Sequence, residues 1–461
     1  MMEQIGFDPV NAALALKQLP HAPAVFALYG EQAHAEPYIG RTPNLRARLE
    51  RLLQPSPKHP RRLQLAGRVR RIEYRLTGSD FESLLLQFEL LQQVYGPKAN
   101  DRMHLRAPAF IRYLGSNAYP RIAVTNRPSQ READWAYGPF QSRAAAERFA
   151  DEALKLFLLR RCTDDLDPNP SHPGCVYSEM KMCLAPCYKG CTGERYQEES
   201  TAVESFLATR GDSRLVTLRI QRDQASANLE FETAATLHAQ VQRVESVRAL
   251  APELVRPLSK LRAIILQPSA GLDEVSIFLY KDGTLRGPQL FSTLGMRIQN
   301  EQAGSTSLFA QPMSLEPVPE FPEPQTGDAS EQASELKGHG LSRTDDGRES
   351  DRALDPGGSL PADQTKTANN ILKLPRSLLE SRLEAALAVL SSSSQTPSPT
   401  LRQGHLALIK RWYYRPEARR TGEIFFPDTE GQWPIKAILR GIGRVAAKSL
   451  QNHLTADKVQ S

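Results

Sequence analysis

Three side chains near the start of the chain have the chemistry to hold a phosphate group: Tyr38, Arg41 and Arg48. An arginine presents a rigid fork of N–H donors, and a tyrosine hydroxyl donates or accepts one hydrogen bond. Both kinds of group suit the oxygens of a phosphate. We therefore expect this segment to contact phosphate, provided that the surrounding elements bring the three side chains together.

Cysteine spacing provides a second chemical signal. Four of the five cysteines follow the pattern C-x12-C-x7-C-x3-C, at Cys162, Cys175, Cys183 and Cys187, and Cys191 lies outside it. Two thiolates four residues apart on a turn, with two more brought in by a loop, can enclose one soft metal centre. In a reducing compartment such a group is more often a metal site than a disulfide framework. Zinc suits four thiolates equally well, and free structural thiols are the remaining alternative.

The segments around the phosphate-type side chains predict a small sheet with helices beside it. Residues 24–29 form an apolar run long enough for one buried strand, and residues 38–40 fit a short second strand. Residues 44–49 have helical character, and residues 69–77 alternate apolar and polar side chains as a third strand does. Two strands, a turn and a basic helix would put the three side chains near one edge of the sheet. We expect them to lie together on one basic face, with Gln87 pointing into the same cleft.

A longer helix is expected after the third strand. Ser79 or Asp80 would cap its N-terminus, because a short polar side chain there accepts a hydrogen bond from a backbone N–H of the first turn. The apolar residues repeat with the 3.6-residue period of a helix that has one buried face. They are Phe81, Leu84, Leu85, Phe88 and Leu91.

The rest of the chain predicts further short elements. Residues 213–250 carry a heptad-like apolar pattern, for which we expect two antiparallel helices between 215 and 247 with a turn near Glu230. The other periodic segments predict strands at 108–112, 120–124, 261–266, 275–280 and 289–293, helices at 142–157 and 374–390, and a hairpin turn at 281–283.

Composition bounds the class of protein. The chain has 461 residues, of which 40% are hydrophobic and 34 are prolines, and its formal net charge is +6. This length allows about two to four domains joined by linkers. The charge is uneven, since residues 41–75 hold eleven Lys or Arg against Glu50 and Glu73. Such a block indicates a polyanion partner, and a solvated basic face is the alternative.

Two stretches predict linkers, and the C-terminal stretch is basic and aromatic. Residues 301–366 are rich in Pro, Ser, Gly, Glu and Asp, so we expect disorder there, and residues 391–399 predict another linker. Residues 405–450 fit either a small core with a basic rim or a surface on which aromatic rings stack bases. No apolar run is long enough to cross a bilayer, and no signal-peptide pattern opens the chain, which favours a cytoplasmic protein.

Together these motifs resemble the UvrC-like and Cho-like excinuclease family of nucleotide excision repair. Residues 24–26 and 38–40 stand at the two signatures of its GIY-YIG nuclease domain, and residues 44–49 match the Asn-Leu-x-x-Arg helix. The cysteine spacing, with Leu-Ala-Pro between its last two members, is similar to the family's cysteine block. That similarity implies a [4Fe–4S] cluster. Residues 225–235, ASANLEFETAA, match the UVR motif, a helical hairpin.

The resemblance implies an α/β protein made of successive modules. The first is a GIY-YIG nuclease-like domain with a small antiparallel sheet and flanking helices at 15–105. Connecting strands and a helix at 106–160, a cysteine-cluster segment at 161–200 and the UVR helical hairpin at 211–250 follow. The remaining modules are a small β region at 255–298, a disordered linker at 301–368, and a helix plus basic aromatic region at 370–461. We expect the RNase H-like nuclease domain of full-length UvrC to be absent. Residues 441–444, GIGR, resemble the turn of a helix-hairpin-helix DNA-binding unit.

The resemblance also assigns roles to single residues. Tyr38, Arg41, Arg48 and Asn100 stand at catalytic positions, and Gln87 stands where the family has the Glu that holds Mg²⁺ or Mn²⁺. An amide oxygen can coordinate such an ion, but it lacks the charge that carboxylate sites use to hold it.

Other positions of the nuclease pattern are altered as well. Phe26 and Leu52 stand where the family has tyrosines. Two carboxylates of the same helix would replace the missing metal ligand only if they faced the same way as Gln87. At 100° per residue, Glu89 lies about 160° and Glu82 about 140° away from it. We therefore expect both carboxylates to point elsewhere.

Two functions follow from the resemblance. The first is metal-dependent incision of damaged DNA, in which Tyr38 helps to activate water and Arg41 and Arg48 stabilise developing charge. The second is a catalytically degraded relative that binds DNA or the excision-repair protein UvrB without cutting, and the altered positions favour it. An RNA-binding metal-cluster protein fits the basic blocks but not the UVR string.

The implied partners are DNA and the excision-repair protein UvrB, in a repair and SOS-response setting. The UVR motif would contact UvrB through an apolar set at its centre, although an apolar helix stripe is also typical of an ordinary core. The set comprises Leu229, Phe231, Ala234 and Ala235.

Overall fold

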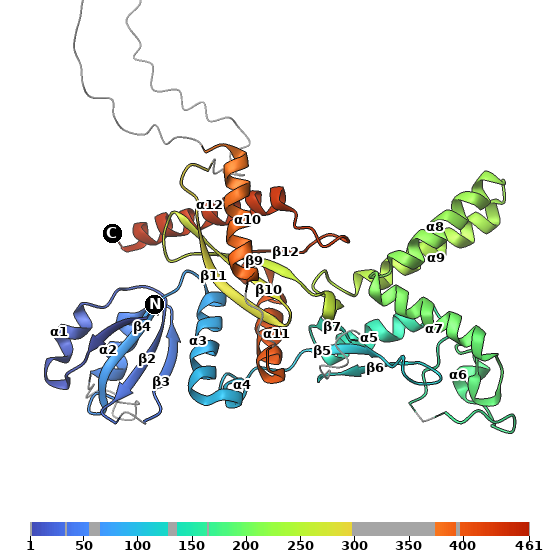
Figure 1. The fold of residues 1–461 in the computed structure, drawn as a ribbon, viewed down its shortest axis with the longest axis horizontal. Coiled ribbons are helices and arrows are strands. Elements are labelled where there is room, and N and C mark those ends of the chain that lie inside the picture. The colour runs from blue at the N-terminus through green and yellow to red at the C-terminus, as the bar shows by residue number, and fades with distance from the viewer. Residues whose placement is uncertain are drawn as a thin grey trace, which may run out of the picture. The chain divides into compact units, whose positions relative to one another are not determined.

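Three four-stranded sheets organise the described residues (Figure 1). The computed structural model describes residues 2–32, 35–54, 65–127, 136–163, 166–296, 374–392 and 397–460, with side chains as far as 451. The linker expected at 301–368 and the middle of the one expected at 391–399 lie outside the described residues. None of the described helices is long and apolar enough to cross a bilayer.

The first sheet is antiparallel, with strand order β1-β4-β2-β3. Its strands are β1 (Glu3–Gly6), β2 (Ala24–Gly30), β3 (Tyr38–Thr42) and β4 (Val69–Leu76). Its flanking helices are α1 (Ala12–Lys17) and α2 (Leu45–Leu53) on one face and α3 (Asp80–Tyr95) on the other. The small antiparallel sheet predicted at the N-terminus is thus confirmed, and β3 forms its edge.

The pleat of β3 divides its side chains between two cores. Successive side chains of a strand point to opposite faces of the sheet. Tyr38 packs against the cluster that includes α1 and α2, whereas Ile39 packs against the cluster that includes α3. This alternation decides on which face each polar side chain of β3 lies.

The predicted cap and the predicted apolar face of α3 are both present. Ser79 Oγ accepts a hydrogen bond from the backbone N–H of Glu82 at 3.1 Å. All five of the expected apolar side chains of the helix are buried. The helix therefore begins where its sequence predicts and presents the predicted face to a core.

That core also contains side chains from much later in the chain, and Ile39 of the first sheet packs against it. It includes side chains of β10 (Glu274–Lys281) and α11 (Pro399–Tyr413). The ring of Phe81 lies 5.2 Å from that of Phe278 and 5.4 Å from that of Trp412, measured between centroids. Trp412 is 1% exposed, so this aromatic residue of the C-terminal stretch serves a core and not a base-stacking surface.

The second sheet has the order β6-β5-β7-β8. Its strands are β5 (Ala109–Tyr113), β6 (Ile122–Thr125), β7 (Ala136–Phe140) and β8 (Arg256–Pro257), and its core includes α5 (Arg143–Leu154) and α7 (Gly193–Ala208). The strands expected at 108–112 and 120–124 are confirmed with small shifts. The helix expected at 142–157 is also present, and it ends at Leu154.

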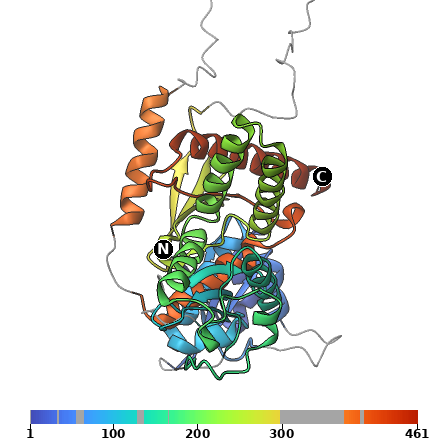
Figure 2. The ribbon, with the colours of Figure 1, turned by 90° about the vertical axis from the view of Figure 1, so that its right-hand side faces the viewer.

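The predicted helical hairpin is also confirmed. Helices α8 (Asp212–Ala227) and α9 (Phe231–Ala249) run side by side in opposite directions, with residues 228–230 between them (Figures 1 and 2). Leu218 of α8 and Val241 of α9 are buried in the same core. The chain therefore reverses next to Glu230, as the heptad-like pattern predicts.

The third sheet has the order β11-β10-β9-β12. The new strands are β9 (Ala263–Pro268), β11 (Thr284–Ser292) and β12 (Glu423–Phe425). Asp282 and Gly283 have φ values of 53° and 83°, the left-handed pair that a two-residue hairpin turn requires. The three strands and the turn expected between 261 and 293 are therefore present.

One sheet joins two segments that the sequence suggests are separate. β12 pairs antiparallel with β9, and helices α10 (Arg376–Ser391) and α12 (Ile435–Gln460) pack on the same sheet. The regions expected at 255–298 and 370–461 thus share a core. Residues 441–444 lie inside α12, so the helix-hairpin-helix turn expected there is wrong.

Candidate functional site

Tyr38 and Arg48 lie together beside the edge of the first sheet. Arg48 is on α2, and its Nη2 donates a hydrogen bond to the Tyr38 hydroxyl at 3.4 Å. The side chain of Asn44 accepts from Ala47 N at 3.0 Å, which fixes the start of α2 and with it the position of the arginine. A phenol and a guanidinium held this way can both meet one phosphate oxygen.

Arg41 lies on the opposite face of the same strand. It stands beside Val25 of β2 in the sheet register, and an odd separation from Tyr38 places the two side chains on different faces. The Arg41 guanidinium contacts Asp80 at the start of α3. The three phosphate-type side chains thus share an edge of the sheet, as expected, but the prediction that they lie on one common face is wrong.

The Asp80 carboxylate is held by two arginines. One of its oxygens meets Arg41 and the other meets Arg415, which follows α11. A carboxylate in the first turn of a helix also interacts favourably with the helix dipole. Asp80 is predictable from sequence as a helix-terminal polar residue, but nothing local points to Arg415, because the two residues are far apart along the chain.

Gln87 lies on the same flank of α3 as Asp80. The two residues are seven positions apart, which corresponds to a rotation of about 20° and two turns of helix. Gln87 is half-buried. On this flank of α3, the carboxylate nearest to Gln87 is therefore that of Asp80. Both of its oxygens already contact guanidinium groups.

The other two carboxylates of α3 lie on the opposite flank, as the helix phase predicts. Glu82 accepts from the backbone N–H of Gly78 at 3.0 Å and is 3.7 Å from Arg75. Burial raises the pKa of Glu89 to about 7, against an opposing effect of Arg75. Neither side chain faces the flank of Gln87.

These residues do not fit a site for Mg²⁺ or Mn²⁺. Such ions take several oxygen ligands and depend on carboxylate charge, whereas the family's ligand position carries an amide. Among the described residues, no group of three His, Cys, Asp or Glu side chains is arranged to hold an ion. The chemistry left to this region is therefore binding of phosphate oxygens by guanidinium and phenol groups.

Asn100 is used elsewhere. It lies on α4 (Ala99–Arg102), and its Nδ2 donates to the backbone carbonyl of Thr400 on α11 at 3.1 Å. Its Oδ1 is buried without a hydrogen-bond partner in the structure. The fourth expected catalytic side chain thus lies at the contact between α4 and α11 and not beside Tyr38.

The four cysteines of the predicted centre lie within electrostatic range of one another. Burial, together with the smaller effects of Cys162, Cys175 and Cys187, raises the pKa of Cys183 to about 11. The fifth thiol, Cys191, is influenced by Arg195 and Cys187. In the described conformation, no three thiols are yet close enough to ligate one ion, so the shared centre stays a prediction.

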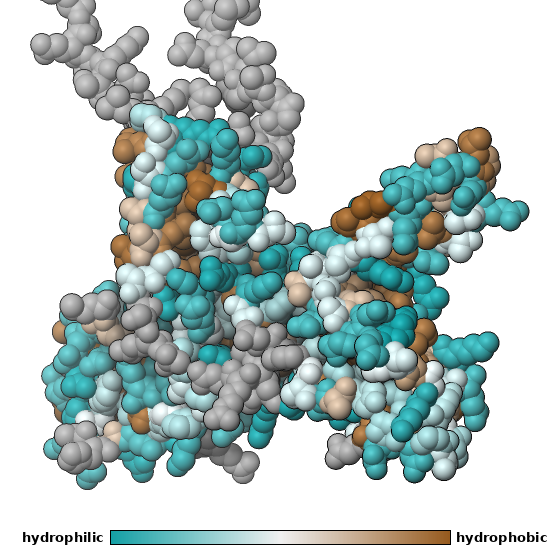
Figure 3. All heavy atoms as spheres, turned by 45° about the vertical axis from the view of Figure 1, so that its right-hand side comes forward, coloured by the Kyte–Doolittle hydropathy of each residue, from teal (hydrophilic) through white to brown (hydrophobic). Residues whose placement is uncertain are grey.

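The free end of the α8–α9 hairpin is apolar. Leu229 is 71% exposed and Phe231 is 67% exposed, and hydrophobic colour gathers at this end in the space-filling view (Figure 3). Ala234 and Ala235 continue along the first turns of α9, half-buried and exposed respectively. Leu229 has a left-handed backbone, with φ 63°. Large apolar side chains held out in this manner are typical of a docking surface.

Comparison with known proteins supports the resemblance. Residues 22–100 match the model of the UvrC-like GIY-YIG domain, and residues 110–206 match that of the UvrC/Cho excinuclease middle domain. The UvrABC system protein C of Alcanivorax borkumensis is 28% identical over 62% of this chain and 46% of its own length. That of Ruminiclostridium cellulolyticum is 30% identical over 60% and 45%. The chain thus aligns with less than half the length of these relatives, and no solved structure matches it.

Glu89 provides a pH-dependent test of the α3 geometry. Its folded pKa, about 7, lies above the ordinary value of 4.5, so folding favours the protonated carboxyl, and the associated stability is lost as the pH rises through 7. Glu89→Gln should raise the free energy of unfolding by about 1–3 kcal/mol well above pH 7 and leave it unchanged below pH 4.5. Urea unfolding at the two pH values measures this. Glu417→Gln, at an exposed position, is the control. An equal effect of Glu89→Gln at both pH values would contradict the burial of Glu89.

Proposed function

We propose, on the premise that this chain is a relative of the UvrC/Cho excinucleases of nucleotide excision repair, that it binds DNA and an excision-repair partner while its GIY-YIG domain has lost efficient incision. It would act in the cytoplasm, where bacterial DNA repair takes place. One observation carries the loss of incision: the position that holds the catalytic metal in the family is Gln87, and the nearest carboxylate on its flank, Asp80, is neutralised by Arg41 and Arg415.

DNA binding rests on the edge of the first sheet. Tyr38 and Arg48 present one hydroxyl and one guanidinium there, and both groups can hold a phosphate oxygen without a metal. Arg51 and Arg68 of the same basic block are exposed. Cationic side chains of this kind supply the salt-dependent, sequence-independent part of DNA affinity.

Not every arginine of the block is available for DNA. Arg41 contacts Asp80, and Arg75 lies 3.7 Å from Glu82. The structural role of these two arginines removes charge from the side of the sheet that faces α3. We infer that the nucleic acid approaches the edge beside α2.

Partner binding rests on the exposed apolar tip of the α8–α9 hairpin. Leu229 and Phe231 project from a helical pair whose own core is complete without them. Aromatic side chains that become buried on association often dominate the binding free energy. The UVR-like string around these residues identifies the excision-repair protein UvrB as the expected partner.

The cysteine segment is proposed to hold one [4Fe–4S] cluster, with zinc as the alternative. Cys162, Cys175, Cys183 and Cys187 form a soft donor set, and their mutual effect on the pKa of Cys183 supports their grouping. When bound, such a cluster cross-links the loops that carry it and can exchange one electron. The chain's own contribution would be to supply the four thiol ligands.

The DNA-binding proposal predicts binding without efficient cutting. Duplex affinity should fall steeply with salt, and Arg48→Gln should lower the slope of log K against log salt by about one, since one phosphate contact is lost. Incision of damaged duplex with UvrA, UvrB and Mg²⁺ should stay near background. Gln87→Glu should raise metal-dependent cleavage, whereas Gln93→Glu, an exposed position of the same helix, should not.

Two results bear on this proposal in different ways. Efficient incision by the unchanged protein would contradict the loss of activity and would mean that another carboxylate supplies the ligand. An inert Gln87→Glu protein would instead identify Phe26 and Leu52 as the limiting changes.

The docking proposal predicts that the hairpin tip is needed for partner affinity. Phe231→Ser and Leu229→Ser should each weaken binding to UvrB about tenfold or more with little effect on the melting temperature, because both side chains are exposed. Ile220→Ser is a matched control, since Ile220 is an exposed apolar residue of α8 within the helix. Titration calorimetry measures the affinities, and unchanged values for the tip variants would disprove the docking role.

The cysteine proposal predicts that the metal content of the protein depends on Cys183 and not on Cys191. Protein purified without oxygen should contain iron, or else zinc, and Cys183→Ser should abolish the metal content. Cys191→Ser should retain it, because Cys191 lies outside the spacing pattern. Elemental analysis provides the measurement, and metal-free wild-type protein would remove the claim.

A further inference from the structure

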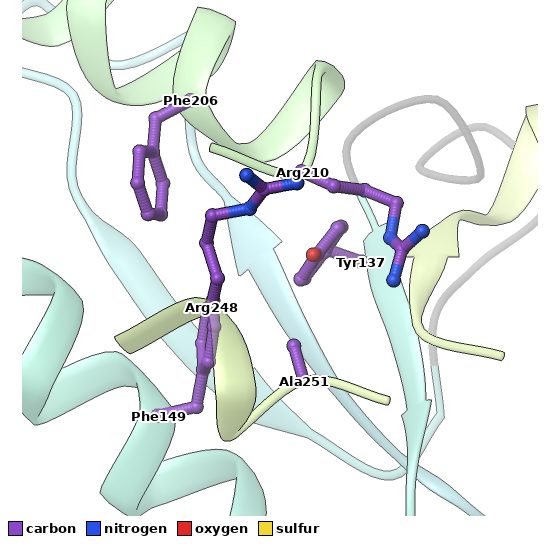
Figure 4. A pocket seen from close by; sticks show the side chains of 6 residues that line it. All are labelled: Tyr137, Phe149, Phe206, Arg210, Arg248 and Ala251. Carbon is purple, nitrogen blue, oxygen red and sulfur yellow. The ribbon is translucent and has the colours of Figure 1, made fainter. Parts of the chain in front are cut away.

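A small cavity lies where the end of α7 and the start of α8 meet β7 and the end of α9. Its lining is two arginines among aromatic and small side chains (Figure 4): Tyr137, Phe149, Phe206, Arg210, Arg248 and Ala251. Its volume is about 20 Å³, which is room for roughly one water-sized atom. Figure 4 shows the guanidinium groups of Arg210 and Arg248 on either side of the Tyr137 ring.

The polar groups of this cavity are incompletely paired, and the Arg248 side chain is 33% exposed. The Arg210 Nε is buried without a hydrogen-bond partner, and Tyr137 is 3% exposed. Burial raises the pKa of the Tyr137 hydroxyl to about 12, while the charges of Arg210, Arg248 and Arg256 all act to lower it. Three cations therefore act on one hydroxyl, and two of them, Arg210 and Arg248, line the cavity.

Among the described residues, carboxylates act on two of these cations but no ion pair is formed by Arg210. Arg248 forms an ion pair with Asp212 at 3.0 Å. Glu253 supports the charge of Arg256, yet burial and the neighbouring Arg210 still lower the pKa of Arg256 to about 10. Arg210 is thus left without an ion pair among these residues, and like charges held close together are unfavourable. An additional anion would offset this cost.

The backbone is shaped to place the arginines. Arg210 and Gly211 both have positive φ, at 55° and 88°. A Cβ on Gly211 would lie 2.8 Å from Cγ of Arg248, so only glycine lets the Arg248 side chain cross the turn between α7 and α8. A left-handed conformation is costly for a residue such as Arg210, and backbone outliers of this kind occur preferentially at ligand sites.

We propose that this cavity is a phosphate-binding pocket, in which one phosphate oxygen enters between Arg210 and Arg248 and accepts a hydrogen bond from Tyr137. A charged phosphate oxygen can accept several hydrogen bonds at once, so a single oxygen can face both guanidinium groups and the Tyr137 hydroxyl. The cavity admits one oxygen only, so the rest of the phosphate stays outside. The phosphate can belong to a nucleic-acid backbone, which rests on the proposed function, or to a free phosphate ion.

Inorganic phosphate tests the pocket without DNA. The melting temperature of the full-length protein is measured in phosphate and in chloride at the same ionic strength. Phosphate at about ten times its dissociation constant should raise this temperature by about 2 °C relative to chloride. Arg210→Gln should abolish the rise. Tyr137→Phe, which keeps the ring packing, and Arg248→Lys, which keeps the charge beside Asp212, should each reduce it. Arg219→Gln removes a half-exposed arginine of α8 and should leave the rise intact. No rise in the wild type, or an equal rise in Arg210→Gln, would overturn the pocket.

DNA binding identifies the source of the phosphate. If the backbone of DNA occupies the pocket, Arg210→Gln should lower the slope of log K against log salt by about one relative to Arg219→Gln. An unchanged slope together with a lost phosphate effect assigns the pocket to free phosphate. Wild-type protein that does not bind DNA would refute the proposed function, and the melting measurement would still decide the pocket.

Discussion

The packing of α3 fixes most of what the candidate site can do. Its apolar face is buried against β10 and α11. Phe88 lies so near Gly404 of α11 that a Cβ added to this glycine would come within 2.2 Å of the phenylalanine ring. A helix held in this way cannot turn about its axis, so its polar side chains keep the directions that the 3.6-residue period gives them. Asp80 and Gln87 share one flank and the two glutamates share the other. The loss of the metal-binding carboxylate therefore cannot be repaired by a neighbour on the same helix.

Features with local signals could be predicted from the sequence. The cap of α3 at Ser79 depends on residues of one helical turn, and the reversal at Asp282 and Gly283 depends on two residues that tolerate positive φ. The apolar period of α3 and the break between α8 and α9 extend over a few turns of helix and were equally visible. For the candidate site, the sequence correctly predicted that Tyr38 and Arg48 meet at a sheet edge and that neither Glu82 nor Glu89 faces Gln87.

Features that depend on distant residues could not be predicted. Nothing near Asn100 indicates that its amide would bond to Thr400, and nothing near Asp80 indicates Arg415. The separation of Arg41 from Tyr38 is an exception, because strand alternation alone predicts it. We expected these side chains on one face because they share an edge of the sheet, but an edge strand presents its side chains on both faces. The arginines around Tyr137 have no spacing pattern at all, since they come from different helices and a strand, and only the folded chain brings them together.

The pairing of β12 with β9 has a consequence for how the chain matures. The apolar face of β9, β10 and β11, with Ile264 and Leu266 at its centre, is covered by α10 and α12, which are encoded after residue 374. A nascent chain that has just left the ribosome with β11 must keep this face from other molecules until its C-terminal residues are synthesised. A premature stop codon before α10 would leave the face and the edge of β9 permanently open, and would produce an aggregation-prone fragment rather than a shorter working protein.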